Sequence, residues 1–435
     1  MLSPASNAIF RLPEELRSEV LSYCSSSTVL NLCLASKALH AVFIDSIYHT
    51  IDLSTHNEGK WGIHYDYINV MLPDDHVKRT LTDRDVSVLL RQEKLISRLK
   101  KHPELGSKTR VLRWTLMDNT AFDGVLFVEP SHWTDVLWTT FKCFSHVIEI
   151  DLAFMTRYRE QTEPPPLFRT ATSISLAGLM SHDVVASILS FIDPSRLRHL
   201  KLNNLQTFAD PPHILNTLQP EEIQLHQRDR PGAIQGYLST LTGRCPTLCS
   251  LHISTTGQFL DTNISRTGPS VLGNQEFQDG NNQYIEIAAF LESVKGTLRE
   301  FVFEHGPDFE LFHISPTNPT WLPYSGLSLS DPLPMDVFFD SHILPVISSG
   351  PWPKLQQMFV RGVGQWKPID PWQETSGLEE VAYLHRKIKE FHSRAEMIWN
   401  AVDRSKAEVV VEDEASRPFY RLRADTRRNM TGARD

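Results

Sequence analysis

Short stretches of alternating apolar and polar residues recur along the chain between residues 111 and 361. Eight stretches share this pattern: VLRWTL, VIEIDLA, ATSISLA, LRHLKLN, EEIQLHQ, LCSLHIS, LREFVFE and LQQMFVR. Period-two alternation is typical of a β-strand that buries one face and exposes the other to water. We therefore predict a strand in each stretch, with one side of every strand open to solvent.

Helical patterns lie between these strands, with apolar residues repeating at intervals of three and four. They cover residues 82–99 and 287–294, follow Ser131 and Ser181, and recur at 343–347. A longer helix carries one apolar seam, formed by Val381, Leu384, Ile388, Phe391, Ala395, Ile398 and Val402. Because strands and helices alternate along the chain, the pattern predicts a parallel sheet with crossover helices.

The spacing of the strands indicates an irregular repeat. Equivalent positions follow one another at intervals within the leucine-rich-repeat range of roughly 20–29 residues, at Ile150, Ile174, Leu200, Ile223 and Leu251. A doubly wound sheet would bury both strand faces, so the alternation favours a curved solenoid with helices on its convex side. A compact α/β domain is the alternative. The seam helix is expected to cap the solenoid or to pair with itself as a coiled coil.

The solvent-facing side of the strands is the place where such a solenoid would read a partner. By parity this side carries, as candidate target-binding residues, His199, Lys201, Gln224, His252, Glu300, Val302, Glu304, Phe359 and Arg361. Val302 and Phe359 are apolar, so they are the candidates for a binding hot spot. The alternative is a solvated face with no binding role.

The segment from residue 11 to residue 43 concentrates apolar side chains in a short helical pattern near the amino terminus. Pro13 suits a first helical turn, and Ser27 or Thr28 can cap a second helix. Each fully buried Leu or Val is worth roughly 1.5–3 kcal/mol, and so short a segment cannot hide several of them alone. These residues pack against the rest of the chain or against another protein.

The sequence LPEELRSEVLSYC followed by VLNLCLASKALHAVF resembles the F-box, a short helical motif that opens LPxEL. SIYHTIDLS, further on, is similar to a stretch that follows this motif in many filamentous-fungal F-box proteins. The chain departs from the motif at Cys24-Ser25-Ser26, Ala35 and Leu39. The resemblance implies that the segment inserts into the adaptor subunit of a cullin–RING ubiquitin ligase, through Leu12, Pro13, Leu16, Val20, Leu21, Leu30, Leu34 and Leu39.

These patterns together predict an α/β chain of four parts. An N-terminal helical F-box module (1–50) and a connecting helical segment (51–110) precede an irregular leucine-rich-repeat-like solenoid (111–365). The solenoid would contain long insertions near 255–283 and 305–340, and a C-terminal capping helix with a basic tail (366–435) would complete the chain.

Composition narrows the function classes. The formal charge is −9, from 52 acidic and 43 basic residues, which argues against a general nucleic-acid binder. The five cysteines form no CxxC pair, and Cys245 and Cys249 lack a second ligand pair for zinc. No apolar run approaches the roughly 20 residues needed to cross a bilayer, and no signal-peptide pattern opens the sequence. We expect no membrane contact and an intracellular protein, with cytoplasm or nucleus left open.

No phosphate-binding, nucleophile-elbow, metalloprotease or dinucleotide-binding motif occurs, and Ser181-His182-Asp183 cannot form a relay from adjacent positions. We therefore expect no enzyme activity and no cofactor. The leading hypothesis is a substrate-receptor subunit of a ubiquitin ligase, which binds the adaptor, through it a cullin, and an unknown protein target. A protein-binding scaffold without ligase recruitment is the second hypothesis, and a hydrolase or transferase with an unrecognised site is the third.

Overall fold

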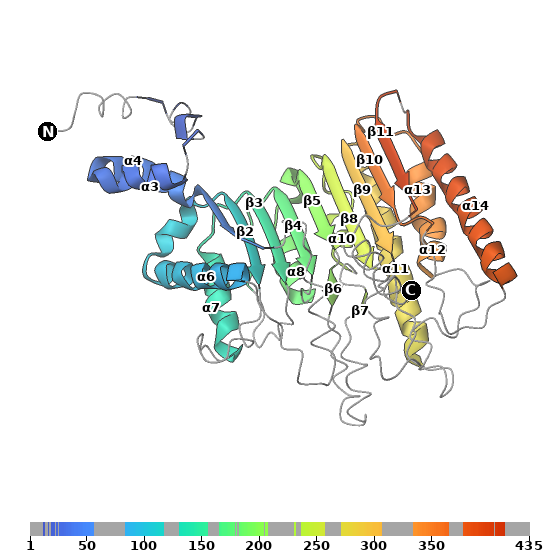
Figure 1. Ribbon diagram of the computed structural model, residues 1–435, viewed down its shortest axis with the longest axis horizontal. Coiled ribbons are helices and arrows are strands. Elements are labelled where there is room, and N and C mark those ends of the chain that lie inside the picture. Colours follow the sequence, from blue (N-terminus) through green and yellow to red (C-terminus); the bar gives the residue numbers. More distant parts are fainter. Residues whose placement is uncertain are drawn as a thin grey trace, which may run out of the picture.

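A curved sheet of nine parallel strands forms the centre of the computed structural model (Figure 1). Its strands are β1 (Thr50–Leu53), β2 (Val111–Leu116), β3 (Glu149–Phe154), β4 (Ser173–Gly178), β5 (His199–Asn203), β8 (Ser250–Thr256), β9 (Glu300–Gly306), β10 (Gln357–Arg361) and β11 (Glu408–Glu412). They lie side by side in the order in which they occur in the chain. Two short strands, β6 (Gln206–Thr207) and β7 (Arg230–Pro231), form a separate antiparallel pair.

The structure describes residues 26–55, 83–116, 130–154, 165–178, 182–203, 236–256, 271–306, 334–364, 377–403 and 405–413, together with 12, 13, 16, 19–21, 23, 24, 180, 205–207, 230 and 231. In these ranges the helices are α3 (Ser26–Ala35), α4 (Lys37–His49), α6 (Asp83–Lys101), α7 (Pro130–Lys142), α8 (His182–Leu189), α10 (Leu238–Leu241), α11 (Val271–Val294), α12 (Pro334–Phe338), α13 (Leu344–Ser348) and α14 (Gly377–Ala401). Shorter helical turns are η1 (Pro103–Lys108), η2 (Pro194–Arg196) and η5 (Phe339–Ile343).

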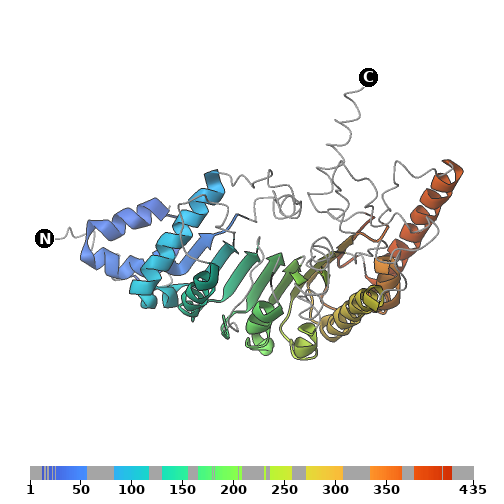
Figure 2. The same ribbon diagram turned by 90° about the horizontal axis from the view of Figure 1, so that it is seen from below.

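Helices α7, α8, α10 and α11 line one face of the sheet, on the outer side of its curve (Figure 2). The strand side chains that point toward them are apolar and buried, as Leu112 and Trp114 illustrate. The ring of Trp114 packs edge-on against Phe141 of α7, with centroids 5.6 Å apart. One continuous apolar core joins these contacts from Ile51 in β1 to Val411 in β11, so the first and last strands share it.

The strand predictions hold for seven of the eight alternating stretches, which form β2, β3, β4, β5, β8, β9 and β10. The parallel sheet with crossover helices is also confirmed. The eighth stretch, EEIQLHQ, lies outside the described residues, and β5 pairs directly with β8. The alternation of exposed and buried side chains does not extend over the full length of every strand, which the sequence did not reveal. In β2, β3 and β4 the last three residues are all buried, so only the first half of each strand has an accessible side.

The predicted fold class is wrong. The chain is α/β, but a nine-stranded all-parallel sheet replaces the expected leucine-rich-repeat-like solenoid. The expected F-box module is not evident either, because the described N-terminal residues define two helices, α3 and α4. The physical reason is the same in both cases. Apolar periodicity reports which side of an element is buried, and several folds bury the same side.

The C-terminal helix also differs from the prediction. Helix α14 exists and lies at the C-terminal end of the sheet (Figure 1), but it connects β10 to β11, so one more strand of the same sheet follows it. Its predicted apolar seam is broken, because Val381 and Ile388 are exposed whereas Lys387 and Arg394 are buried. The sheet thus extends into both terminal segments, and α11 begins at Val271, inside a segment predicted as an insertion. The proposed domain boundaries remain predictions.

Candidate interaction sites

Helices α3 and α4 form a hairpin at one end of the sheet, with a small core of its own. Val29 and Cys33 of α3 pack against Phe43 of α4, separately from the main core. Ser36 ends the turn between the helices, and its hydroxyl accepts a hydrogen bond from the Leu39 amide at 3.1 Å. This is the N-cap geometry that starts a helix, and it fixes the angle at which α4 leaves α3.

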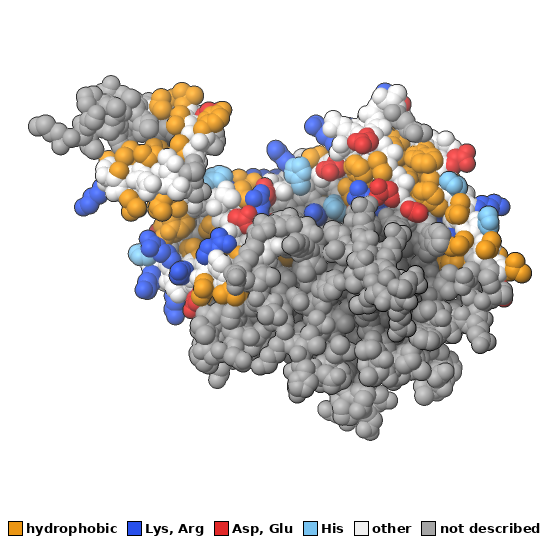
Figure 3. Space-filling view, viewed as in Figure 1, with side chains coloured by type: hydrophobic (Ala, Val, Ile, Leu, Met, Phe, Trp, Pro, Cys, Tyr) orange, Lys and Arg blue, Asp and Glu red, His pale blue; other side chains and the backbone are white. Residues whose placement is uncertain are grey.

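Large apolar side chains remain on the outside of this hairpin and the residues before it. Among the described residues, five of the fourteen strongly exposed large apolar side chains fall between positions 16 and 34. We call these five the leucine patch: Leu16 (51% exposed), Val20 (44%), Tyr23 (82%), Leu30 (48%) and Leu34 (75%). Figure 3 shows apolar side chains gathered on this N-terminal part, beside the body of the molecule.

The eight predicted adaptor-binding residues divide into two groups. Leu16, Val20, Leu30 and Leu34 belong to the leucine patch, and Pro13 is also exposed. The other three are half-buried: Leu12, Leu21 and Leu39. Leu21 and Leu39 pack on the hairpin core, so they support the hairpin as well as its surface. Tyr23, the most exposed member of the patch, was absent from the predicted set.

The hairpin is joined firmly to the sheet. Helix α4 continues into β1 without an intervening loop, and the amide of Arg110 donates to the His49 carbonyl at 2.9 Å. The Lys108 amine pairs with Asp45 on α4. These contacts give helix α4 a fixed orientation relative to the sheet.

The second candidate surface is the face of the sheet that carries no helix, which we call the open face. Its residues form two rows that cross all nine strands in register, and all of them except Val302 are at least partly accessible. The first row is Thr50, Val111, Glu149, Ser173, His199, Ser250, Glu300, Gln357 and Glu408. The second is Asp52, Arg113, Asp151, Ser175, Lys201, His252, Val302, Phe359 and Val410. A third row, from Thr115 to Arg361, is mostly buried.

Most of the predicted target-binding residues lie on the open face. His199 is exposed, and Lys201, His252 and Phe359 are half-buried. Glu300 of β9 and Arg361 of β10 also belong to this face. Glu300 pairs in register with Gln357, and Arg361 pairs with Glu304. The structure buries Val302 and Glu304, at 7% and 5% exposure, and Gln224 lies outside the described residues. Of the two apolar residues predicted as a hot spot, only Phe359 therefore keeps accessible surface.

Charges on the open face pair off at its two ends. Near β1, the guanidinium of Arg113 lies 3.0 Å from Glu149 and 3.6 Å from Asp52. Near β11, Arg361 lies 2.7 Å from Glu304 and 2.8 Å from Glu412. The Arg361 guanidinium also stacks over the Phe359 ring at 5.2 Å. Both arginines are thus bound by acids of the chain itself.

His252 stays neutral at pH 7. Burial lowers its pKa to about 4, and the positive charges of Lys201 and Arg361 add to this effect against the opposing charge of Glu304. A neutral imidazole can donate one hydrogen bond and accept another. The centre of the open face therefore offers hydrogen-bonding groups around one lysine.

A buried ionic cluster links α14 to α12 and was missed by the sequence analysis. The Lys387 amine pairs with Asp336, and both side chains are 2% exposed. Arg394 binds Asp340 with two hydrogen bonds of 2.6 and 2.7 Å. Burial lowers the pKa of Lys387, but Asp336, Glu390 and Tyr383 together outweigh this effect and raise it, so the amine is charged. The only sequence signal was the i, i+7 spacing of Lys387 and Arg394 on one helix face.

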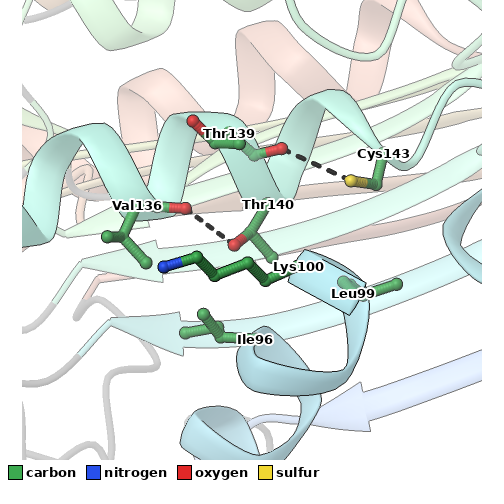
Figure 4. A pocket seen from close by; sticks show the side chains of 7 residues that line it. All are labelled: Ile96, Leu99, Lys100, Val136, Thr139, Thr140 and Cys143. Carbon is green, nitrogen blue, oxygen red and sulfur yellow. Dashed lines mark hydrogen bonds between the residues drawn. The ribbon is translucent and has the colours of Figure 1, made fainter. Parts of the chain in front are cut away.

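Helices α6 and α7 enclose an open groove of about 260 Å³ on the helix side of the sheet (Figure 4). Its lining is Ile96, Leu99, Lys100, Val136, Thr139, Thr140 and Cys143. The Thr140 hydroxyl donates to the Val136 carbonyl at 2.7 Å, and the Cys143 thiol donates to the Thr139 carbonyl at 3.4 Å. Burial raises the pKa of Cys143. These bonds within α7 leave a mainly apolar lining with an unactivated thiol.

Comparison with known proteins assigns the chain to no family. No protein-family model matches the chain, and no curated protein matches it. Within the described ranges, no group of three His, Cys, Asp or Glu side chains could hold a metal ion. No helix in the same ranges is long and apolar enough to cross a membrane. By its fold the chain is an α/β protein with two accessible surfaces, the leucine patch and the open face.

Proposed function

We propose that this chain is a substrate-receptor subunit of a cullin–RING ubiquitin ligase, which binds the adaptor subunit through the leucine patch and a protein target through the open face. The observation that carries the proposal is the exposure of five large apolar side chains between positions 16 and 34. Concentrated apolar surface on a small helical element is typical of a protein-binding site. The sequence resemblance of residues 12–39 to the F-box motif supports the choice of the adaptor as the partner.

The role of such a receptor is to hold one protein at a fixed distance from another. The direct passage from α4 into β1 would keep the adaptor and the target in one orientation. Holding a target lysine near a charged conjugating enzyme raises its effective concentration, so no side chain of this chain needs to react. The complex would form inside the cell, in cytoplasm or nucleus, where the five free cysteines stay reduced.

A Leu30→Asp, Leu34→Asp variant should lose the adaptor. Each leucine contributes roughly 1.5–3 kcal/mol when an interface buries it, so adaptor binding should weaken by about a hundredfold or more. The measurement is binding of the full chain to purified adaptor by surface plasmon resonance. Both side chains are exposed in the free chain, so the melting temperature should change little.

The matched control is Leu378→Asp, Val381→Asp, which places the same charges on exposed apolar positions of α14, at 82% and 51% exposure. This variant should bind the adaptor as the wild type does. Equal binding by wild type and the Leu30→Asp, Leu34→Asp variant would refute the proposal.

A scaffold that recruits no ligase is the second candidate function. It is favoured by the small core that Val29, Cys33 and Phe43 give the hairpin, because this core is complete without an adaptor. In this case the wild-type chain would not bind the adaptor at all, and the leucine patch would bind a different protein. The same binding experiment therefore separates the two functions.

A further inference from the structure

The centre of the open face differs from its two ends in having a lysine without an acidic neighbour. Lys201 lies in the middle of β5, paired in register with Ser175 of β4 and His252 of β8. The positions that surround it on these three strands are Ser173, Ser175, Ala177, His199, Asn203, Ser250, His252 and Ser254. None of them is acidic, and Lys201 forms no ion pair with a described residue.

The nearest acids of the open face are already engaged. Asp151 is two strands from Lys201 and lies beside Arg113, whose charge it stabilises. Glu300 accepts a hydrogen bond from Ser250 at 2.8 Å, and Glu304 pairs with Arg361. Because strands are about 4.8 Å apart, a separation of two strands is about 10 Å, close to the screening length in physiological salt. No described residue therefore compensates the Lys201 charge, although the whole chain carries −9.

We infer that the Lys201 region binds a side-chain carboxylate in an acidic segment of the target protein. The lysine supplies one positive charge, and the serines and the neutral His252 around it supply hydrogen bonds. One positive charge matches the single negative charge of an Asp or Glu side chain. A phosphate dianion would keep one charge uncompensated here, and it is typically bound by arginine clusters. This inference rests on the proposed function, since it names the chemistry of the target at the same face.

The test starts from peptide selection on the immobilised full chain, without the adaptor. Selected peptides should share an Asp or Glu. With the tightest of them as probe, Lys201→Met should weaken binding about tenfold, the effect of one charge-assisted hydrogen bond. Replacing the peptide's Glu by Gln should cost the same factor in the wild type and nothing further in Lys201→Met. Lys201→Arg should keep most of the affinity.

Two controls make the result specific. Lys354→Met removes an exposed lysine between α13 and β10, away from the open face, and should leave peptide binding unchanged. The melting temperature of Lys201→Met should equal that of the wild type, because this lysine has no ion pair to lose among the described residues.

Three outcomes would overturn the inference. They are selected peptides without a shared carboxylate, binding that Lys201→Met leaves unaltered, and tighter binding when phosphoserine replaces the Glu, which would assign the site to a phosphorylated segment. Failure of this inference can be told apart from failure of the proposed function. Adaptor binding is tested with variants of the leucine patch, and peptide binding is tested with variants of Lys201. A chain that binds acidic peptides but no adaptor would be a scaffold with this same target chemistry.

Discussion

Replacing Gly362 with alanine should destabilise the protein by about 4 kcal/mol or more, an exceptional loss for one added methyl group. Gly362 follows β10 with a φ of 85°, a backbone conformation that side chains rarely adopt. A Cβ at this position would lie 1.6 Å from the carbonyl oxygen of His305 and 2.8 Å from its carbon. The main chains of β9 and β10 would have to move apart. The measurement is the free energy of unfolding by urea titration.

Gly243 provides the matched control for this substitution. Its φ of 73° is also positive, but an added Cβ would have no atom within 4 Å. Gly243→Ala should therefore cost only the backbone strain, about 1–2 kcal/mol. The difference between the two variants isolates the contact with His305. If both variants lost the same amount of stability, the result would contradict the close approach of the Gly362 and His305 main chains.

Removing one partner of the buried pair between α12 and α14 should have the second large effect. Asp336→Ala leaves the charged Lys387 amine at 2% exposure, with Glu390 at 3.2 Å as its remaining acidic contact. Glu390 is 33% exposed and replaces Asp336 only in part, and breaking a buried ion pair by removing one partner costs about 3 kcal/mol or more. The free energy of unfolding at pH 7 should fall by that amount.

The control removes both charges together. In Asp336→Leu, Lys387→Met, no buried charge remains without a partner, so stability should stay within about 1 kcal/mol of the wild type. A double variant less stable than Asp336→Ala would mean that the pair itself, and not the isolated amine, determines the effect. Arg394 keeps its two hydrogen bonds to Asp340 in both variants.

These two sites explain how the last part of the sheet is held. The Gly362 turn lets β10 pass close to the end of β9, and the ionic cluster fixes α14 against α12 and η5. The His305 ring, in turn, lies 4.9 Å from Phe339 of η5 between ring centroids. Stability in this region therefore depends on specific contacts between segments far apart in the sequence.

Local patterns were enough to predict most elements. The alternation in LRHLKLN and LREFVFE predicted β5 and β9, and the interval pattern of 82–99 predicted α6. Two strands, β1 and β11, were not predicted. In TIDL and EVVVE the polar and apolar residues do not distinguish a short edge strand from a loop or a solvated arm, so only pairing with β2 and β10 makes them strands.

For the candidate surfaces too, the sequence predicted some of the residues and only the fold showed the others. The resemblance to the F-box named Leu30 and Leu34, and the parity of the strands named Lys201, but neither could say which candidates stay accessible. Val302 was named with Phe359 and is buried, whereas Tyr23 was not named and is 82% exposed. The Asp336–Lys387 pair was invisible, because no rule of spacing connects α12 with α14 before they pack.

By itself, the sequence determined most of the strands and helices, which side of the predicted strands is apolar, and the charge balance of the chain. Each of these depends on residues within one or two turns of one another. Only the tertiary structure decided that nine strands share one sheet, that the last residues of β2, β3 and β4 are buried on both sides, and that the strand neighbours of Lys201 include no acid. Burial and pairing depend on segments that are distant in the chain, and periodicity carries no information about which distant segment comes to lie alongside.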